Sequence, residues 1–183
     1  MVMPAPLYWT AQMVRDLPDD RNKYECIDGE LLVTPAPGVP HESAFTKLFL
    51  AVGNHVAREQ CGALFGANSD ISWGRVDVLV QPDLFVVDLE QAQTGAWMSM
   101  RDLLLAVEIV SPSSAKRDRG QKRQLYQRQG VRTYWIVDTT ACTVEVWTPA
   151  DHEPRIVRDQ LTWHPSGAGA PLTVDVPALF APL

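Results

Sequence analysis

Cysteine is scarce in this sequence, and the few cysteines stand far apart. Cys26, Cys61 and Cys142 are the only three among 183 residues. Their number is odd and no CxxC spacing occurs, which argues against both a disulfide framework and a cysteine-based zinc site. Such cysteine usage is typical of a reducing compartment, so we expect the protein in the cytoplasm.

The sequence also lacks long apolar runs and an excess of positive charge. Its longest apolar stretches, such as LLLAV, are far too short to cross a bilayer, and the opening MVMPAPLYW has no basic leader. We therefore expect no membrane partner. The formal net charge of −6 argues against a protein that coats nucleic acid or anionic lipid through its overall field, although a local basic patch could still bind them.

What the sequence does contain is an alternation of helical and strand patterns. With 46% hydrophobic residues, the length fits a single domain over residues 1–183. Helical patterns appear at 10–17, 41–60 and 118–129. Strand patterns appear in KYECID and GELLVTP, in GALFGA, DISW and VDVLVQPDLFVVD, in LLLAVEIV, and in VRTYWIVD and CTVEVWTP. The tail is rich in proline and glycine and poor in strand patterns. This order predicts an α/β domain with a central mixed sheet flanked by helices.

A single carboxylate interrupts the most apolar of these strands. In LLLAVEIV, Glu108 has five apolar residues before it and two after it, and an unpaired buried charge is very costly. Asp83, in the preceding strand pattern, would meet Glu108 if the two strands are neighbours. Two or three hard oxygen ligands are what Mg²⁺ or Mn²⁺ binds. The alternatives are a Glu108 that faces solvent, or one that pairs with an arginine in a structural ion pair.

A strongly basic segment follows that strand. Residues 116–132, KRDRGQKRQLYQRQGVR, hold seven lysines and arginines against one acid, in a chain that is acidic as a whole. Beside a metal such a segment suits phosphate recognition, whereas alone it is more often a solvated helix face. Asp118, Lys122 and Tyr126 lie at i, i+4 and i+8 and so share one helix face. From that face Lys122 could hold or deprotonate an attacking water, or simply pair with Asp118.

Several of these segments occur together and in the same order in one known family: YECIDGEL (24–31), QPDLFVV (81–87), AVEIVSPSS (106–114), then Asp118, Lys122 and Tyr126, and GVRTYWIVD (130–138). By these motifs the chain, from about residue 7 to residue 147, resembles the Uma-type endonuclease family of the PD-(D/E)xK restriction-endonuclease-like superfamily. The resemblance implies a restriction-endonuclease-like core. It also implies Mg²⁺-dependent hydrolysis of DNA phosphodiester bonds, with Mn²⁺ as the other candidate ion.

Within this resemblance, Asp83 corresponds to the aspartate of the superfamily and Glu108 to the acidic residue of its (D/E)xK element. The lysine expected two positions after Glu108 is absent, because Val110 stands there. The resemblance therefore implies Asp83, Glu108 and Lys122 as catalytic residues, with Lys122 supplied by the following helix. Glu30, an acid from the early part of the core, would join Asp83 and Glu108 as a third metal ligand, or else is a surface residue beside its turn.

Substrate binding is expected from the basic segment and from the start of the long helix. The residues implied are His41, Lys116, Arg117, Arg119 and Arg123. His41 could equally be structural. No separate recognition domain is evident, so a separate specificity partner is one expectation, and a homodimer with one site for each strand is another. Two competing hypotheses stay open: a non-catalytic nucleic-acid-binding or interaction module that keeps the nuclease fold, favoured by Val110, and a metal-dependent hydrolase of small phosphate esters.

Overall fold

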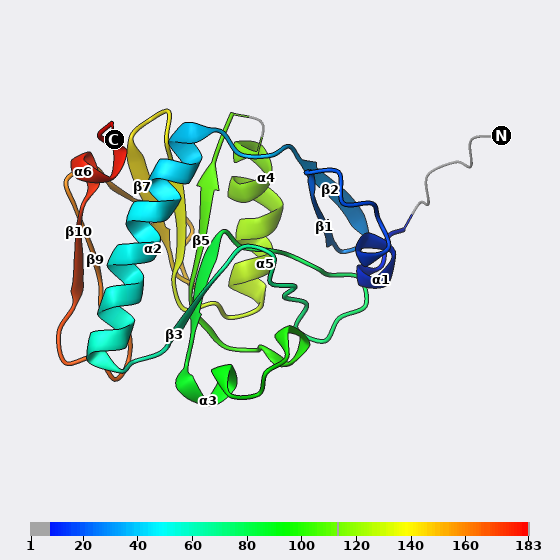
Figure 1. The fold of residues 1–183 in the computed structure, drawn as a ribbon, viewed down its shortest axis with the longest axis horizontal. Coiled ribbons are helices and arrows are strands. Elements are labelled where there is room, and N and C mark those ends of the chain that lie inside the picture. Colours follow the sequence, from blue (N-terminus) through cyan, green and yellow to red (C-terminus); the bar gives the residue numbers. More distant parts are fainter. Residues whose placement is uncertain (1–7, 113, 183) are drawn as a thin grey trace.

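Six strands form a mixed sheet at the centre of the protein (Figure 1). The structure is a computed structural model that describes residues 8–112 and 114–182; the opening MVMPAPL, where no leader is expected, lies outside those ranges. The strand order is β3-β4-β5-β6-β7-β8. Only the central pair β5–β6 of this sheet is parallel, and its other neighbours are antiparallel. The predicted α/β class with a central mixed sheet is confirmed. The strands are β3 (Ala63–Gly66), β4 (Leu84–Val87), β5 (Leu103–Val110), β6 (Tyr134–Asp138), β7 (Thr143–Trp147) and β8 (Arg155–Val157).

The long helix predicted at 41–60 covers one face of this sheet. It is α2 (Val39–Glu59), and Pro40 stands in its first turn, where a missing N–H costs no hydrogen bond. Buried residues recur along it at helical spacing, among them Leu48 and Val52, and pack into one hydrophobic cluster with side chains of β4 to β7. Within the described ranges, no helix is both long and apolar enough to cross a membrane.

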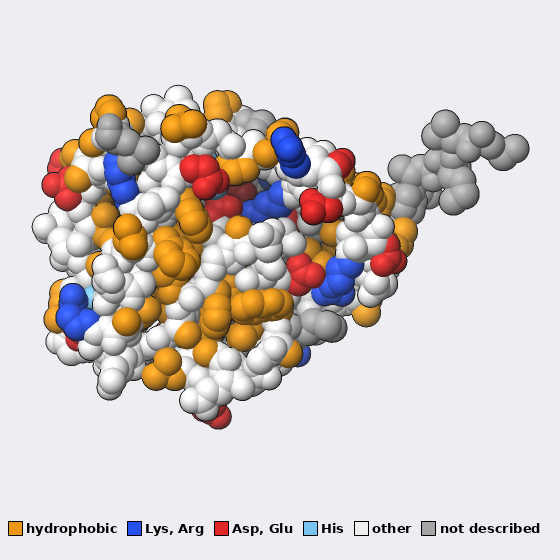
Figure 2. All heavy atoms as spheres, in the orientation of Figure 1, with side chains coloured by type: hydrophobic (Ala, Val, Ile, Leu, Met, Phe, Trp, Pro, Cys, Tyr) orange, Lys and Arg blue, Asp and Glu red, His pale blue; other side chains and the backbone are white. Residues whose placement is uncertain are grey.

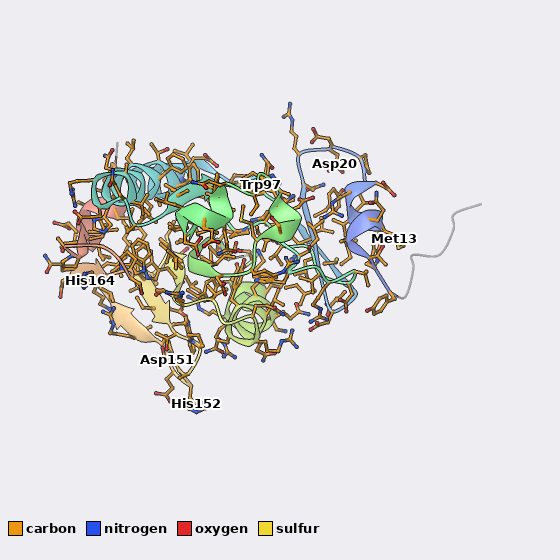
Figure 3. The ribbon with its side chains drawn as sticks, turned by 90° about the horizontal axis from the view of Figure 1, so that it is seen from below. Met13, Asp20, Trp97, Asp151, His152 and His164 are labelled. Atoms are coloured by element: carbon orange, nitrogen blue, oxygen red, sulfur yellow. The ribbon has the colours of Figure 1, made fainter. Side chains whose placement is uncertain are left out.

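Three short helical segments cover the opposite face. Figure 3 shows this yellow-green part of the chain across the sheet from α2. The three segments are α4 (Ala115–Arg117), the π-helical turn η2 (Asp118–Lys122) and α5 (Arg123–Arg128). Leu125 and Tyr126 pack from α5 into a second hydrophobic cluster with β4, β5 and β6. The helix predicted at 118–129 is therefore present, and its first part has the wider π geometry.

The predicted hairpin forms a small sheet of its own. It consists of β1 (Lys23–Ile27) and β2 (Glu30–Thr34), paired in antiparallel register. The two turn residues, Asp28 and Gly29, both have positive φ angles (51° and 82°). That conformation is typical of the two-residue turns that match the strand twist, and it is why Asp-Gly predicts a hairpin here.

The hairpin is fixed to the segment that enters β4. The N–H of Cys26 donates to the carbonyl of Leu79 (2.8 Å), and the N–H of Leu79 donates back to Cys26 (2.9 Å). The helix α1 (Ala11–Arg15), capped by the hydroxyl of Thr10 as its sequence suggests, packs against the same region. The hairpin therefore lies beside Asp83, four positions further along the chain.

Three sequence-based predictions about strands are wrong. The tail is not poor in strands, because short apolar alternations such as Leu161 and Trp163 are buried against α2 and β6. The run 76–88 is not one strand, because only its last part pairs as β4. The segment DISW (70–73) is not a strand, because Ile71 forms only an isolated bridge with Val80. The remaining elements are α3 (Leu89–Ala92), η1 (Trp97–Ser99), β9 (Gln160–Trp163), β10 (Leu172–Asp175) and α6 (Val176–Phe180).

The α2 face offers a test of the packing. We expect Leu48→Ala to lower the free energy of unfolding by about 2–5 kcal/mol, because Leu48 is fully buried and its loss leaves a cavity. Leu50 lies on the same helix but is 58% exposed, so Leu50→Ala should change it by no more than about 0.5 kcal/mol. Urea denaturation measures both values, and equal losses in the two variants would contradict this packing.

Candidate active site

Asp83 and Glu108 lie side by side on the sheet face that α5 covers. In the antiparallel register of β4 and β5, Leu84 pairs with Val107, so the next position sets Asp83 opposite Glu108. The N–H of Asp83 donates to the carbonyl of Val107 (3.0 Å), and the N–H of Ile109 donates to Oδ2 of Asp83 (2.7 Å). Both residues are buried, at 7% and 3% exposure. The two carboxylates converge as the sequence predicts.

Lys122 of η2 extends from the helical layer toward the sheet and contacts Glu108. Its Nζ lies 2.9 Å from Oε1 of Glu108, 2.7 Å from Oε2 of Glu25 and 3.6 Å from Oδ1 of Asp118. One turn later, the hydroxyl of Tyr126 donates to Oε1 of Glu108 (2.9 Å). The face predicted from the spacing of Asp118, Lys122 and Tyr126 does turn toward the sheet.

Two members of the cluster come from β1 and are absent from the sequence-based prediction. Lys23 places its Nζ 3.1 Å from Oδ1 of Asp83 and 3.6 Å from Oε2 of Glu108. Glu25 is 1% exposed, and its Oε1 accepts the N–H of Gln81 (2.8 Å). Because strand side chains alternate, Lys23 and Glu25 share one face of β1. That alternation of charge is the one local feature that could have identified them.

His41 joins the cluster from the first turn of α2. Its Nε2 lies 3.2 Å from Oδ2 of Asp83, and its Nδ1 lies 3.6 Å from Oε1 of Glu42. The structure thus brings the histidine singled out in the sequence to the first of the two acids. Asp83 now has partners from three elements: Lys23 of β1, His41 of α2 and Ile109 of β5.

Burial and neighbouring charge move the acids of this cluster in opposite directions. Burial alone would raise the pKa of Asp83, but the charge of Lys23 and the hydrogen bond with His41 outweigh it and hold that pKa well below its usual range. For Glu108 burial dominates, and with two carboxylates nearby it raises the pKa to about 7 despite the two lysines. Burial likewise raises the pKa of Asp118. One acid therefore stays ionised, while another takes up a proton near neutral pH.

The basic groups of the cluster keep their charge. Burial disfavours the charged form of Lys122, but the two glutamates that it contacts outweigh this and raise its pKa well above the usual value. The same balance, set by Asp83 and Glu108, raises the pKa of Lys23. Burial lowers the pKa of His41, but its bond with Asp83 outweighs burial and raises it. In this arrangement Lys122 is therefore charged and donates hydrogen bonds to the acids around it, which favours the first of the two roles considered for it, that of holding the water.

The cluster lies at an open cavity of about 760 Å³, a size typical of ligand sites. Asp83, Glu108 and Lys122 line it, together with the segment 14–24, the loop 34–38 and the start of α2. Figure 2 shows a hollow in this face, with acidic and basic side chains gathered in it. The buried charges are therefore accessible to a ligand from solvent.

Glu30, the third metal ligand of the sequence-based prediction, does not line this cavity. It is exposed at the start of β2, and its Oε2 accepts a hydrogen bond from Nε2 of Gln121. It borders a second groove instead. The acid that the hairpin does bring to the cluster is Glu25, because its position on β1 faces the sheet whereas Glu30 follows the turn.

Arg119, predicted to hold DNA, is occupied in an ion-pair network of its own. Its guanidinium lies 2.7 Å from Oδ2 of Asp138 and 2.6 Å from Oε1 of Glu145, on β6 and β7. The network ties η2 to the sheet. It leaves Arg119 outside the residues that line the cavity.

The other three DNA contacts predicted in the basic segment also lie away from the cavity, whereas His41 lines it. Arg117 donates to the carbonyl of Val33 (2.7 Å), and Lys116 and Arg117 border the second groove. The guanidinium of Arg123 lies over the ring of Trp147, 4.9 Å from its centroid. The basic segment is therefore divided between internal contacts and a different surface, and the structure does not gather it around Asp83 and Glu108.

The donor atoms fit a hard divalent cation. Carboxylate oxygens, such as those of Asp83 and Glu108, are the ligands that Mg²⁺ and Mn²⁺ prefer. In residues 8–112 and 114–182, however, no three His, Cys, Asp or Glu side chains are grouped as a formed metal site. The ammonium of Lys23 contacts both carboxylates in this arrangement. The space between the two acids thus suits a positive charge, and Lys23 supplies it.

The cluster predicts a strong dependence on Lys122. In Lys122→Met, the three carboxylates that it contacts stay buried without its charge, so we expect the free energy of unfolding at pH 7 to fall by about 3–5 kcal/mol. The loss should shrink at pH 4, because acids whose pKa is raised by burial then enter the folded state protonated. Urea denaturation at both pH values measures it; a loss that is equal at the two would contradict this account.

Glu108 itself should titrate near neutrality. ¹³C NMR of labelled glutamate should show its carboxyl changing ionisation near pH 7, since its pKa is raised to about 7. Its unfolded value is lower, so this group alone lowers stability as pH rises from about 4.5 to 7 and changes nothing further above that. A midpoint near the ordinary glutamate value would show that the carboxyl is solvated.

Comparison with known proteins identifies the family and the fold of this chain. No curated protein matches the chain. Among solved structures, one from Anabaena variabilis ATCC 29413, titled a "putative nuclease belonging to DUF820", superposes with a TM-score of 0.78 at 21% identity, over 94% of this chain and 97% of that one. At that identity the likeness shows the fold alone. A family model described as "Putative restriction endonuclease" matches residues 11–176, and the chain therefore belongs to that family, Uma2.

Proposed function

We propose that this protein is a cytoplasmic endonuclease that hydrolyses DNA phosphodiester bonds with Mg²⁺ or Mn²⁺. The observation that carries the proposal is the pair of carboxylates, Asp83 and Glu108, which face each other at an open cavity, with the ammonium of Lys122 against Glu108. Membership of a family described as restriction endonucleases supports the reaction class.

Asp83 and Glu108 are the residues that would hold the ion. When bound, it would supply positive charge to the scissile phosphate and acidify the attacking water. Asp83 suits this role because its pKa is held below the usual range, so it is ionised at every physiological pH. Glu25 is the acid that the hairpin brings to the cluster, 2.7 Å from Nζ of Lys122, and we propose it in place of Glu30.

Lys122 acts as a fixed cation. Three carboxylates keep its ammonium charged and in place, so it donates hydrogen bonds to the nucleophile or to the developing charge on the phosphate. A preorganised donor of this kind needs no rearrangement as the transition state forms. His41 orients Asp83 through its Nε2 contact.

The side chains at the rim of the cavity carry charges of both signs, which affects how strongly DNA would bind there. The rim carries acids, Asp19, Glu42 and Asp70, as well as Arg15, which pairs with Asp70 at 2.9 Å. A rim of mixed charge attracts a polyanion weakly, because phosphates are held chiefly by uncompensated lysines and arginines. We therefore propose that a separate specificity partner, or a second copy of the chain, supplies much of the affinity for DNA.

The alternative of a non-catalytic module is favoured by one observation. The contacts of Lys23 with both carboxylates already balance their charge without a metal. Such a module would bind nucleic acid equally well with and without divalent ions and would be indifferent to Glu108→Gln. Calorimetric titration of DNA in Mg²⁺ and in chelator distinguishes the two hypotheses.

Cleavage of supercoiled plasmid tests the catalytic proposal. We expect Asp83→Asn and Glu108→Gln each to lower the rate in Mg²⁺ or Mn²⁺ by about 100-fold or more, because each removes a charge from the reacting centre. Glu90→Gln makes the same chemical change at an exposed residue of α3 and should leave the rate unchanged. An inactive wild type, or full activity in the two site variants, would refute the proposal.

A further inference from the structure

The cluster contains two ammonium groups, whereas the chemistry proposed for the site needs one. Lys122 and Lys23 approach Glu108 from different elements and contact different oxygens, Oε1 and Oε2. Four carboxylates surround the two lysines: Glu25, Asp83, Glu108 and Asp118. The second lysine therefore calls for a role of its own.

The two lysines are held with different firmness. Lys122 is 4% exposed and contacts three carboxylates, the nearest at 2.7 Å. Lys23 is 21% exposed and contacts two, at 3.1 and 3.6 Å. It is also the first residue of β1 and lines the cavity, so its long side chain can turn into open space without disturbing the sheet. Lys23 is the exchangeable cation of the pair.

The place of Lys23 is the one that a metal ion would need. Its Nζ contacts both Asp83 and Glu108, the two acids proposed as metal ligands. A divalent ion and an ammonium within a few ångströms repel each other strongly in a partly buried site. The two cations therefore exclude each other from the space between these carboxylates.

We propose that Lys23 is the resident cation of the metal-free site: it holds Asp83 and Glu108 together, and a divalent ion binds only by displacing it. The inference rests on the proposed function, in which these two acids receive the ion. In this arrangement the charge of Lys23 balances the charges of Asp83 and Glu108.

Displacement has a measurable consequence for metal affinity. Lys23→Met keeps the length of the side chain and removes its charge, so Mn²⁺ should bind at least about tenfold more tightly than to wild type, in the absence of nucleic acid. Isothermal calorimetry and the electron paramagnetic resonance of free Mn²⁺ both report this affinity. Lys23→Arg keeps a competing charge and should bind Mn²⁺ as weakly as wild type.

A matched control separates this effect from a general change of field. Arg21 lies two residues away and lines the same cavity, and it is exposed. Arg21→Met removes the same unit of charge without vacating the carboxylates, so it should alter Mn²⁺ affinity by less than about threefold, given solvent screening. An equal gain in Lys23→Met and Arg21→Met, or no gain in Lys23→Met, overturns the inference.

A measurement on the wild-type chain avoids dependence on the folding of a variant. ¹⁵N NMR of lysine side chains should show both buried ammonium groups without Mg²⁺. On titration with Mg²⁺ the signal of Lys23 should be lost to exchange with solvent, while that of Lys122 remains. Persistence of both signals at saturating Mg²⁺ overturns the inference.

The outcomes also distinguish this inference from the proposed function. If wild type binds Mn²⁺, and Asp83→Asn abolishes binding, the metal site stands whatever the result for Lys23. If Lys23→Met then shows no gain, only the resident-cation inference falls. If neither wild type nor Lys23→Met binds Mn²⁺ at millimolar concentration, metal dependence itself is refuted, and the inference falls with it.

Discussion

The arrangement of this protein around its cavity depends on one constraint, the neutralisation of buried carboxylates. Glu25, Asp83, Glu108 and Asp118 are all less than a tenth exposed, and each would be very costly alone. No single element supplies all four acids and both lysines. The cluster is assembled from the hairpin, the antiparallel strands β4 and β5, η2 and the first turn of α2. These elements must therefore meet at one end of β5 for the site to form.

The sequence identifies those residues of the site that stand out in their local pattern. Glu108 stands out in an apolar strand, and Lys122 follows from a helix face at regular spacing. Lys23 and Glu25 give no such contrast, because KYECI looks like a half-exposed hairpin strand. What buries them is the pairing of Cys26 with Leu79, a contact between segments more than fifty residues apart that no local pattern contains. Because this contact is tertiary, the sequence points to Glu30, whereas the fold brings Glu25 to the cluster.

The number of basic residues in a sequence segment also does not predict where their side chains lie in the folded protein. The seven basic residues of 116–132 are contiguous in sequence, but a helix distributes them around its axis. Arg119 is neutralised by Asp138 and Glu145, Lys122 turns inward, and Arg117 reaches the hairpin. The fold was predictable at the level of class and main helices because periodicity averages over many residues. The direction of one side chain depends on its neighbours in space.

A buried ion cluster by itself is weak evidence for stability, since well-packed apolar residues of similar volume often serve a core as well or better. The cluster here has a further property that a purely structural network does not require: it faces a cavity open to solvent. Glu108 also has a pKa displaced by burial to near neutrality, a feature that gathers at functional sites. Charges that are costly to bury, and that are nevertheless left accessible to a ligand, are most simply explained by what they bind. The function proposed for this protein therefore depends on the cation between Asp83 and Glu108, because that cation is the one a phosphate in the cavity would meet.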